Sequence, residues 1–176
     1  MALDAIQLIG YTKDGDGLKF SVEAVTFSTG KIIFPTRFGG GVFGLMEIED
    51  DIDSILKGKS KRDIAGIVAL LDQRIAYLDE NGERAIGHTA WFERLKHYDG
   101  AYYALRIVRL ANIRVIYTHI DRKPFLLYAF CETARGNAKT DSYKTACKIA
   151  SARLGNFVTE GVGQCIKIIS ITARNP

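Results

Sequence analysis

The chain has 176 residues, of which 47% are hydrophobic and 25% are charged, and its formal net charge is +4. This length and composition suit one folded domain with a sizeable core and exclude a disordered chain. No apolar run approaches the roughly 20 residues that a membrane-spanning helix needs, so no membrane partner is expected.

Cysteine and histidine are few and scattered. The three cysteines (Cys131, Cys147 and Cys165) are odd in number, and the three histidines show no H-x-x-x-H spacing. The sequence therefore predicts neither a disulfide framework nor a metal site, and it predicts no cofactor. The N-terminus has no basic segment followed by a small-residue cleavage site, so a reducing, cytoplasmic location is expected.

Charge is distributed unevenly along the chain. Residues 1–93 carry 10 basic and 15 acidic groups, whereas residues 94–155 carry 12 basic and 4 acidic groups. A basic segment of this kind attracts polyanions or an acidic protein partner, and a solvated basic face is the simpler alternative.

The first 58 residues are expected to form a β-rich extension with a glycine-rich loop and a short acidic helix. The runs "AIQLIGY", "LKFSVEAVTF" and "KIIFP" are separated by turn signals and predict a β meander over residues 3–35. The glycines of "RFGGGVFG" fit G-x-G-x-x-G, but the carboxylates of the following "LMEIEDDID" would repel phosphate, so a loop is favoured over a nucleotide site. Those carboxylates suit the first turn of a helix, which Gly58 would end.

Residues 59–155 are expected to form the core of the protein. A helix is predicted that begins at the capping residues Ser60 and Asp63 and ends at the stop signal Asn81-Gly82. The β-rich runs "YYALRIV", "IRVIYTHI" and "FLLYAF" follow, and their short connections predict antiparallel neighbours. "TDSYKTACKIASARLG" predicts a second amphipathic helix, and "CIKIISITA" predicts a strand in the tail, residues 156–176.

Two arginines interrupt the predicted strands. Because side chains alternate between the faces of a strand, Arg106 shares a face with Tyr102 and Ala104, and Arg114 shares a face with Ile116. Depending on the register, both arginines can lie on one face of the sheet, where guanidinium groups would bind phosphate. Pairing with acidic side chains is the structural alternative.

The order of these motifs resembles the RelE/HigB-like toxins of bacterial toxin–antitoxin systems. The similarity covers residues 61 to 154: an amphipathic helix, then "LKHYDGAYYALRI", "ANIRVIYTHID" and "FLLYAFCETARGNAKTDSYKTACKIASARL". It implies an α+β fold with a small antiparallel sheet flanked by amphipathic helices, to which this chain adds the N-terminal meander. It also implies a cytoplasmic endoribonuclease that cuts mRNA on the ribosome without a metal ion and is silenced by an antitoxin protein.

The resemblance assigns roles to particular residues. Arg106 and Arg114 match the arginines of the two signature strands and would hold the scissile phosphate, while Tyr143 would contact a base or the reacting ribose. Lys139 would complete the catalytic set. The other RNA-binding residues implied by the resemblance are Arg109, Arg135 and Lys144.

The chain departs from the family pattern at three positions and leaves two other functions open. Ala104 stands where an acidic residue is usual, and Glu132 and Thr133 stand where lysines are expected. A ParE-like toxin that inhibits a protein such as gyrase, and a non-catalytic phage-type binding protein, would use the same scaffold. The sequence does not decide among these three functions or give an oligomeric state.

Overall fold

The computed structural model describes the side chains and backbone of residues 42–45, 47–96, 98, 101–120, 122–133, 138 and 141–156. It also describes the backbone of five short strands before residue 42: β1 (Leu8–Thr12), β2 (Lys19–Val22), β3 (Val25–Thr26), β4 (Ile32–Ile33) and β5 (Thr36–Phe38). Most of the predicted meander and the whole predicted C-terminal strand lie outside the described residues. Within this part of the chain, no helix is long and apolar enough to cross a membrane.

The helix α2 begins and ends at the capping signals of the sequence. In α2 (Lys61–Asn81), the Ser60 hydroxyl accepts a hydrogen bond from the Asp63 backbone N–H at 3.1 Å. The helix ends at Gly82, where φ is 52° and the backbone N–H donates to the carbonyl of Leu78. These boundaries confirm the predicted helix. The other helical elements are α1 (Glu47–Leu56), the 3-10 helix η1 (Gly82–Gly87) and a helix over residues 141–156.

The strands form a mixed sheet in the order β1-β2-β5-β6-β10-β9-β8-β7, and β3 and β4 pair separately. The four strands β7 (Phe92–Leu95), β8 (Tyr102–Ile107), β9 (Ile113–Ile120) and β10 (Lys123–Cys131) are successive antiparallel neighbours, as predicted for the last three. However, β6 (Phe43–Gly44) pairs with β10 in parallel. The expected α+β class is confirmed, but the sheet is mixed and not antiparallel throughout, because a strand from the glycine-rich segment joins the far side of β10.

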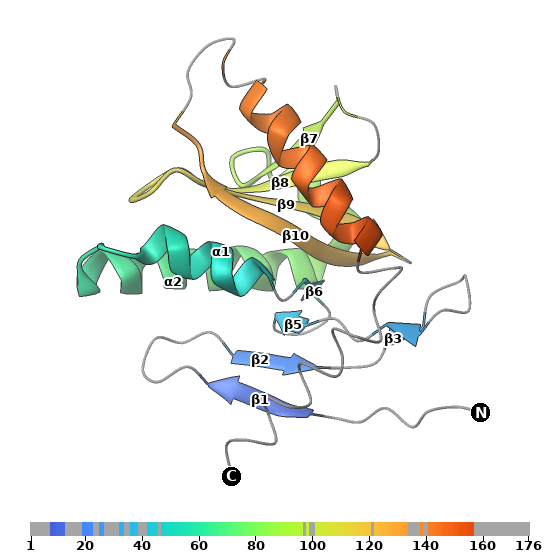
Figure 1. Cartoon of the computed structure of the whole chain (residues 1–176), viewed down its shortest axis with the longest axis horizontal. Coiled ribbons are helices and arrows are strands. Elements are labelled where there is room, and N and C mark those ends of the chain that lie inside the picture. The colour runs from blue at the N-terminus through green and yellow to red at the C-terminus, as the bar shows by residue number, and fades with distance from the viewer. Residues whose placement is uncertain are drawn as a thin grey trace.

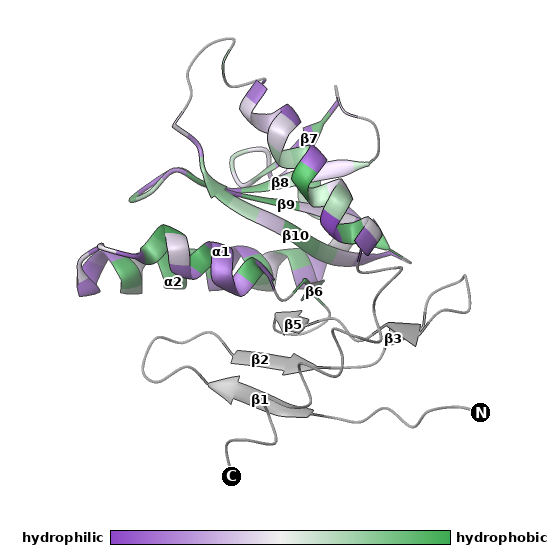
Figure 2. Cartoon of the chain, viewed as in Figure 1, coloured by the Kyte–Doolittle hydropathy of each residue, from purple (hydrophilic) through white to green (hydrophobic). Residues whose placement is uncertain are grey.

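Helices cover both faces of the part of the sheet formed by β7 to β10 (Figure 1). On one face, α1 and α2 bury the side chains of Ile52, Leu71 and Ile75 against Leu105 and Val115 of the sheet. On the other face, the helix 141–156 buries its alanine-rich stripe. Both α1 and α2 carry hydrophobic and hydrophilic segments (Figure 2), as expected of helices that bury one side only.

Residues 42–56, which were expected to belong to the N-terminal extension, contribute to both layers. Val42, Ile48 and Ile52 belong to the core under α1 and α2, and Phe43 and Leu45 belong to the core under the helix 141–156. The predicted glycine-rich loop is thus in part a buried strand.

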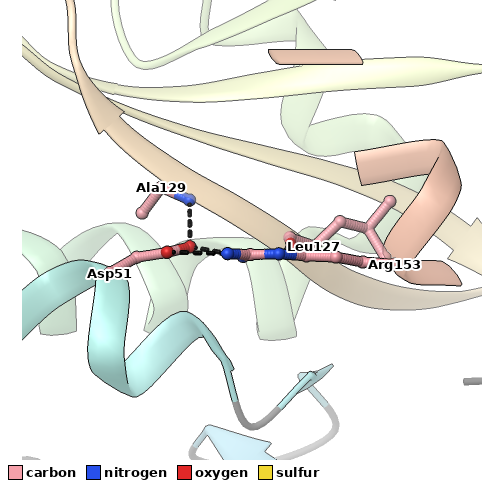
Figure 3. Close-up of polar contacts among 4 residues, drawn as sticks. All are labelled: Asp51, Leu127, Ala129 and Arg153. Atoms are coloured by element: carbon pink, nitrogen blue, oxygen red, sulfur yellow. Dashed lines mark hydrogen bonds and ion pairs between the residues drawn. The ribbon is translucent and has the colours of Figure 1, made fainter. Parts of the chain in front are cut away.

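An ion pair between α1 and the helix 141–156 lies at the outer edge of β10 (Figure 3). The Arg153 guanidinium donates to both carboxylate oxygens of Asp51, at 2.6 Å and 2.9 Å, and to the carbonyl of Leu127 at 3.2 Å. Asp51 also accepts a hydrogen bond of 2.9 Å from the Ala129 backbone N–H. Only two residues of β10 pair with β6, and the ion pair provides hydrogen-bond partners for backbone groups of β10 that follow them.

Candidate functional site

The two arginines of the predicted strands lie side by side on one face of the sheet. Arg106 of β8 and Arg114 of β9 are direct Cα partners in the antiparallel register. Their neighbours on the same face, Ala104 and Ile116, pack under the helix 141–156. Like charges directly opposite each other destabilise a sheet unless other groups compensate them. The contacts of each arginine therefore show whether it is neutralised within the protein or is accessible to a ligand.

Arg114 is the buried member of the pair, with 4% of its surface exposed. Its Nε donates a hydrogen bond of 2.9 Å to the Tyr143 hydroxyl, and one Nη donates to the carbonyl of Ile113 at 3.0 Å. The aromatic ring of Phe130, the β10 partner of Arg114, meets Tyr143 edge-on at 5.9 Å between centroids. Arg114 is therefore held beneath the helix and does not face solvent.

Arg106 is more accessible and is paired with Glu93 of the edge strand β7. Its Nη1 lies 3.5 Å from Glu93 Oε2, and the two side chains are 26% and 36% exposed. The Tyr143 hydroxyl donates to the same Glu93 oxygen at 3.4 Å. One carboxylate oxygen thus connects Arg106 to Tyr143, and through Tyr143 to Arg114; these four residues are called the arginine cluster below.

The tyrosine of the arginine cluster is protonated at neutral pH, and burial makes its proton harder to remove. Burial raises the pKa of Tyr143 to about 12, Glu93 acts in the same direction, and the positive charges of Arg114 and Arg106 oppose the rise. Burial also raises the pKa of the neighbouring Cys147 thiol to about 11. Tyr143 is therefore a neutral hydrogen-bond donor and acceptor between a carboxylate and a guanidinium.

Glu93 is a member of the arginine cluster that the sequence did not indicate. It is the Cα partner of Ala104, the position where the resemblance leads one to expect an acidic residue. Ala104 is fully buried, and because its side chain is small, the Glu93 carboxylate of the adjacent strand can occupy the space beside it. Glu93 thus supplies the carboxylate that is missing at position 104. Only the β7–β8 register could have revealed this, because Glu93 lies 13 positions before Arg106 in the chain.

The structure brings together three of the seven predicted site residues: Arg106, Arg114 and Tyr143. Arg109 is exposed in the loop after β8, and Lys144 is exposed on the helix 141–156, where its Nζ lies 4.0 Å from Asp141. Arg135 and Lys139 lie outside the described residues.

Comparisons with known proteins identify no relative of this chain. No protein-family model matches the chain, and neither a curated protein nor a solved structure is significantly similar to it. Within the described ranges, no group of three or more histidine, cysteine, aspartate or glutamate side chains is placed to hold a metal ion. The arginine cluster is therefore interpreted from its own chemistry.

Proposed function

We propose that the chain is an endoribonuclease of the toxin type, acting on mRNA at the ribosome without a metal ion and held inactive by an antitoxin protein. The observation that carries the proposal is the arginine cluster, which places a carboxylate, a neutral tyrosine and two guanidinium groups on one face of the sheet. The charge excess of residues 94–155 supports a polyanionic substrate.

The groups of the cluster suit cleavage by the ribose 2′-hydroxyl. In that reaction the 2′ oxygen attacks the adjacent phosphorus and the bond to the 5′ oxygen breaks, which leaves a 2′,3′-cyclic phosphate and a 5′-hydroxyl. Glu93 is accessible enough to accept the 2′-hydroxyl proton, and Arg106 is the cation that would stabilise the extra charge on the phosphate. Tyr143 and Arg114 would hold Glu93 in place from beneath, and Lys139 would supply the proton that the 5′ oxygen requires.

A non-catalytic binding protein on the same scaffold is the second candidate, and two observations favour it. Arg114, expected to touch the scissile phosphate, is buried against Tyr143. Glu132 stands at a position where a lysine is expected, and it is also buried, with 3% of its surface exposed. In this alternative the arginine cluster stabilises the packing of the helix 141–156.

The two functions are separated by cleavage assays on purified ribosomes programmed with a labelled mRNA, in the presence of EDTA. A toxin should produce fragments with 5′-hydroxyl and cyclic phosphate ends. The variants Arg106→Ala and Glu93→Gln should each lose about 100-fold in rate, in the range found when a charge-stabilising group or a general base is removed. Arg84→Ala, which removes an exposed cation from η1, is the matched control and should cleave normally.

Expression in a bacterial host provides the complementary test. The wild-type chain should arrest growth with loss of translated mRNA, and Arg106→Ala should relieve both effects. Folded wild-type protein that neither arrests growth nor cleaves mRNA would support the binding function instead. Arrest with intact mRNA and damaged DNA would point to a gyrase-type target.

A further inference from the structure

The loop between β8 and β9, residues 108–112, concentrates the exposed apolar side chains of the structure. Val108 is 57% exposed and Leu110 is 53% exposed, and no other large hydrophobic residue is exposed in the described part of the chain. Exposed Arg109 stands between them, and hydrophobic and hydrophilic segments meet on this loop in Figure 2. Single exposed apolar residues are normal on protein surfaces, whereas contiguous apolar patches mark contact surfaces, and these two side chains lie two positions apart on one loop.

The backbone of Leu110 indicates that its side chain serves something other than the turn. Its φ is 73°, in the left-handed region that favours glycine and asparagine and is unfavourable for leucine. Asn112, which suits that region, occupies the second left-handed position of the same loop, with φ of 47°. An exposed leucine in a strained conformation is the kind of outlier that points to function.

The loop is held in place by the elements beneath it. Leu110 Cδ1 lies over Gly66 of α2, only 2.8 Å from where a β-carbon on that residue would be. At the other end of the loop, the Glu132 backbone N–H donates to the Asn112 carbonyl at 2.9 Å, and the Asn112 side-chain amide donates to the Glu132 carbonyl. The two apolar side chains are thus presented on an anchored loop.

Two exposed arginines lie near the loop tip, and the one carboxylate on the same stretch of α2, Asp63, accepts a hydrogen bond from the Ser60 hydroxyl. Arg109 is exposed within the loop tip, and Arg62 is exposed one helical turn before Gly66, on the same side of α2. No carboxylate forms an ion pair with either arginine within the described residues. We define the hairpin-tip surface as Arg62, Val108, Arg109 and Leu110.

We propose that the hairpin-tip surface binds an acidic protein segment that presents aliphatic side chains. Val108 and Leu110 would be covered by the aliphatic groups, and the two guanidinium groups would pair with carboxylates at the rim. RNA would engage the arginines but leave the aliphatic side chains exposed to water. This proposal does not rest on the proposed function, because none of the four residues belongs to the arginine cluster; Arg109 alone is also among the RNA-binding residues that the resemblance implies.

The test uses the full chain and a synthetic 16-residue peptide of leucine and glutamate, patterned so that the leucines share one helical face. A peptide of the same composition in scrambled order is the control probe. The patterned peptide should bind in fluorescence anisotropy titrations and should shift the amide resonances of residues 62–66 and 108–112 in the ¹⁵N-labelled chain. The scrambled peptide should bind much more weakly.

Variants separate this surface from general electrostatic attraction. Leu110→Asn should weaken binding at least about tenfold, as loss of an anchoring side chain does, and asparagine suits the left-handed backbone of this position. Arg109→Ser should weaken it as well, whereas Arg84→Ser, at an exposed arginine of η1, should not. Absence of peptide binding, equal binding of the two peptides, or unchanged affinity in Leu110→Asn would each overturn the proposal. The proposal would also be overturned if the chain bound phosphatidylglycerol vesicles or poly(U) instead of the peptide and this binding depended on Leu110.

Discussion

Arg153 and Asp51 are 102 positions apart in the chain, and their side chains form two hydrogen bonds of 2.6 Å and 2.9 Å. The two side chains are 22% and 11% exposed, so the pair is largely shielded from water. Asp51 also accepts from β10, and the Arg153 guanidinium lies 4.9 Å from the ring centroid of Tyr128. The pair thus joins α1, β10 and the helix 141–156 at one point.

Removal of Arg153 should therefore destabilise the fold. We expect Arg153→Met to lower the free energy of unfolding by about 2–3 kcal/mol, because it leaves the shielded Asp51 charge without its cation. Urea denaturation measures the loss. Lys144→Met removes a cation from the exposed pair with Asp141 and should change stability by less than about 0.5 kcal/mol. Equal effects of the two variants would contradict this account, and a double-mutant cycle with Asp51→Asn should show coupling above about 1 kcal/mol.

Tyr143→Phe tests the polar contacts of the arginine cluster. The variant keeps the ring but removes the acceptor of the Arg114 Nε hydrogen bond, so a buried charged donor loses its partner. The expected loss of stability is about 1–3 kcal/mol, again from urea denaturation. Tyr128→Phe is the matched control, because the Tyr128 hydroxyl makes no hydrogen bond within the described residues, and it should be nearly neutral.

Stability should fall at alkaline pH. The pKa of Cys147 is raised from 9.0 to about 11 and that of Tyr143 from 10.0 to about 12, chiefly by burial. The folded chain therefore holds these protons more tightly than the unfolded chain. Their contribution is complete below about pH 9 and is lost as the pH rises toward 12, at up to about 1.4 kcal/mol per pH unit for each group.

The measurement is the urea midpoint between pH 8 and pH 11. In Cys147→Ala the decline should begin about one pH unit later than in the wild type, since tyrosine ionises above the ordinary thiol range. An identical pH dependence of the two proteins would show that the thiol does not contribute.

His119 should make the fold sensitive to acid. Burial lowers its pKa from the ordinary 6.5, with Glu83 and the Gly82 backbone opposing the change, and its ring meets Tyr103 and Tyr117 edge-on. The folded chain then binds this proton less tightly than the unfolded chain. The contribution of neutral His119 to the free energy of unfolding is therefore complete above pH 6.5 and is lost as the pH falls through that value. His119→Phe should flatten the dependence of the urea midpoint between pH 7.5 and pH 5.5, and an unchanged slope would exclude His119 as the cause.

The sequence predicted local features well because they depend on near neighbours. The Ser60 cap and the Asn81-Gly82 stop delimit α2 in the structure. Strand alternation correctly placed Arg106 with Ala104, and Arg114 with Ile116, on their respective faces. The same alternation left open whether the two arginines share a face, which the register of β8 and β9 decides.

Features that join distant parts of the chain could not be predicted in this way. Glu93 enters the arginine cluster only through the register that sets it opposite Ala104. The glycine-rich segment looked like a loop because glycine has low strand propensity, yet its end lies in β6, where Phe43 is buried between helix and sheet. In the sequence Asp51 is one of several carboxylates that suit a helix start, and nothing near it indicates Arg153.

The position of β10 has a consequence for the order in which this protein can assemble during synthesis. Among the strands that the structure describes, β10 is the last in sequence, yet it lies between β6 and β9. A nascent chain that ends before residue 123 has an unfilled gap there, with the edges of β6 and β9 both open to other chains. Arg153, which closes the outer edge of β10, emerges later still. The growing chain therefore cannot complete its fold in steps from the N-terminus, and a ribosome stalled between β9 and the helix 141–156 would hold a species prone to aggregation.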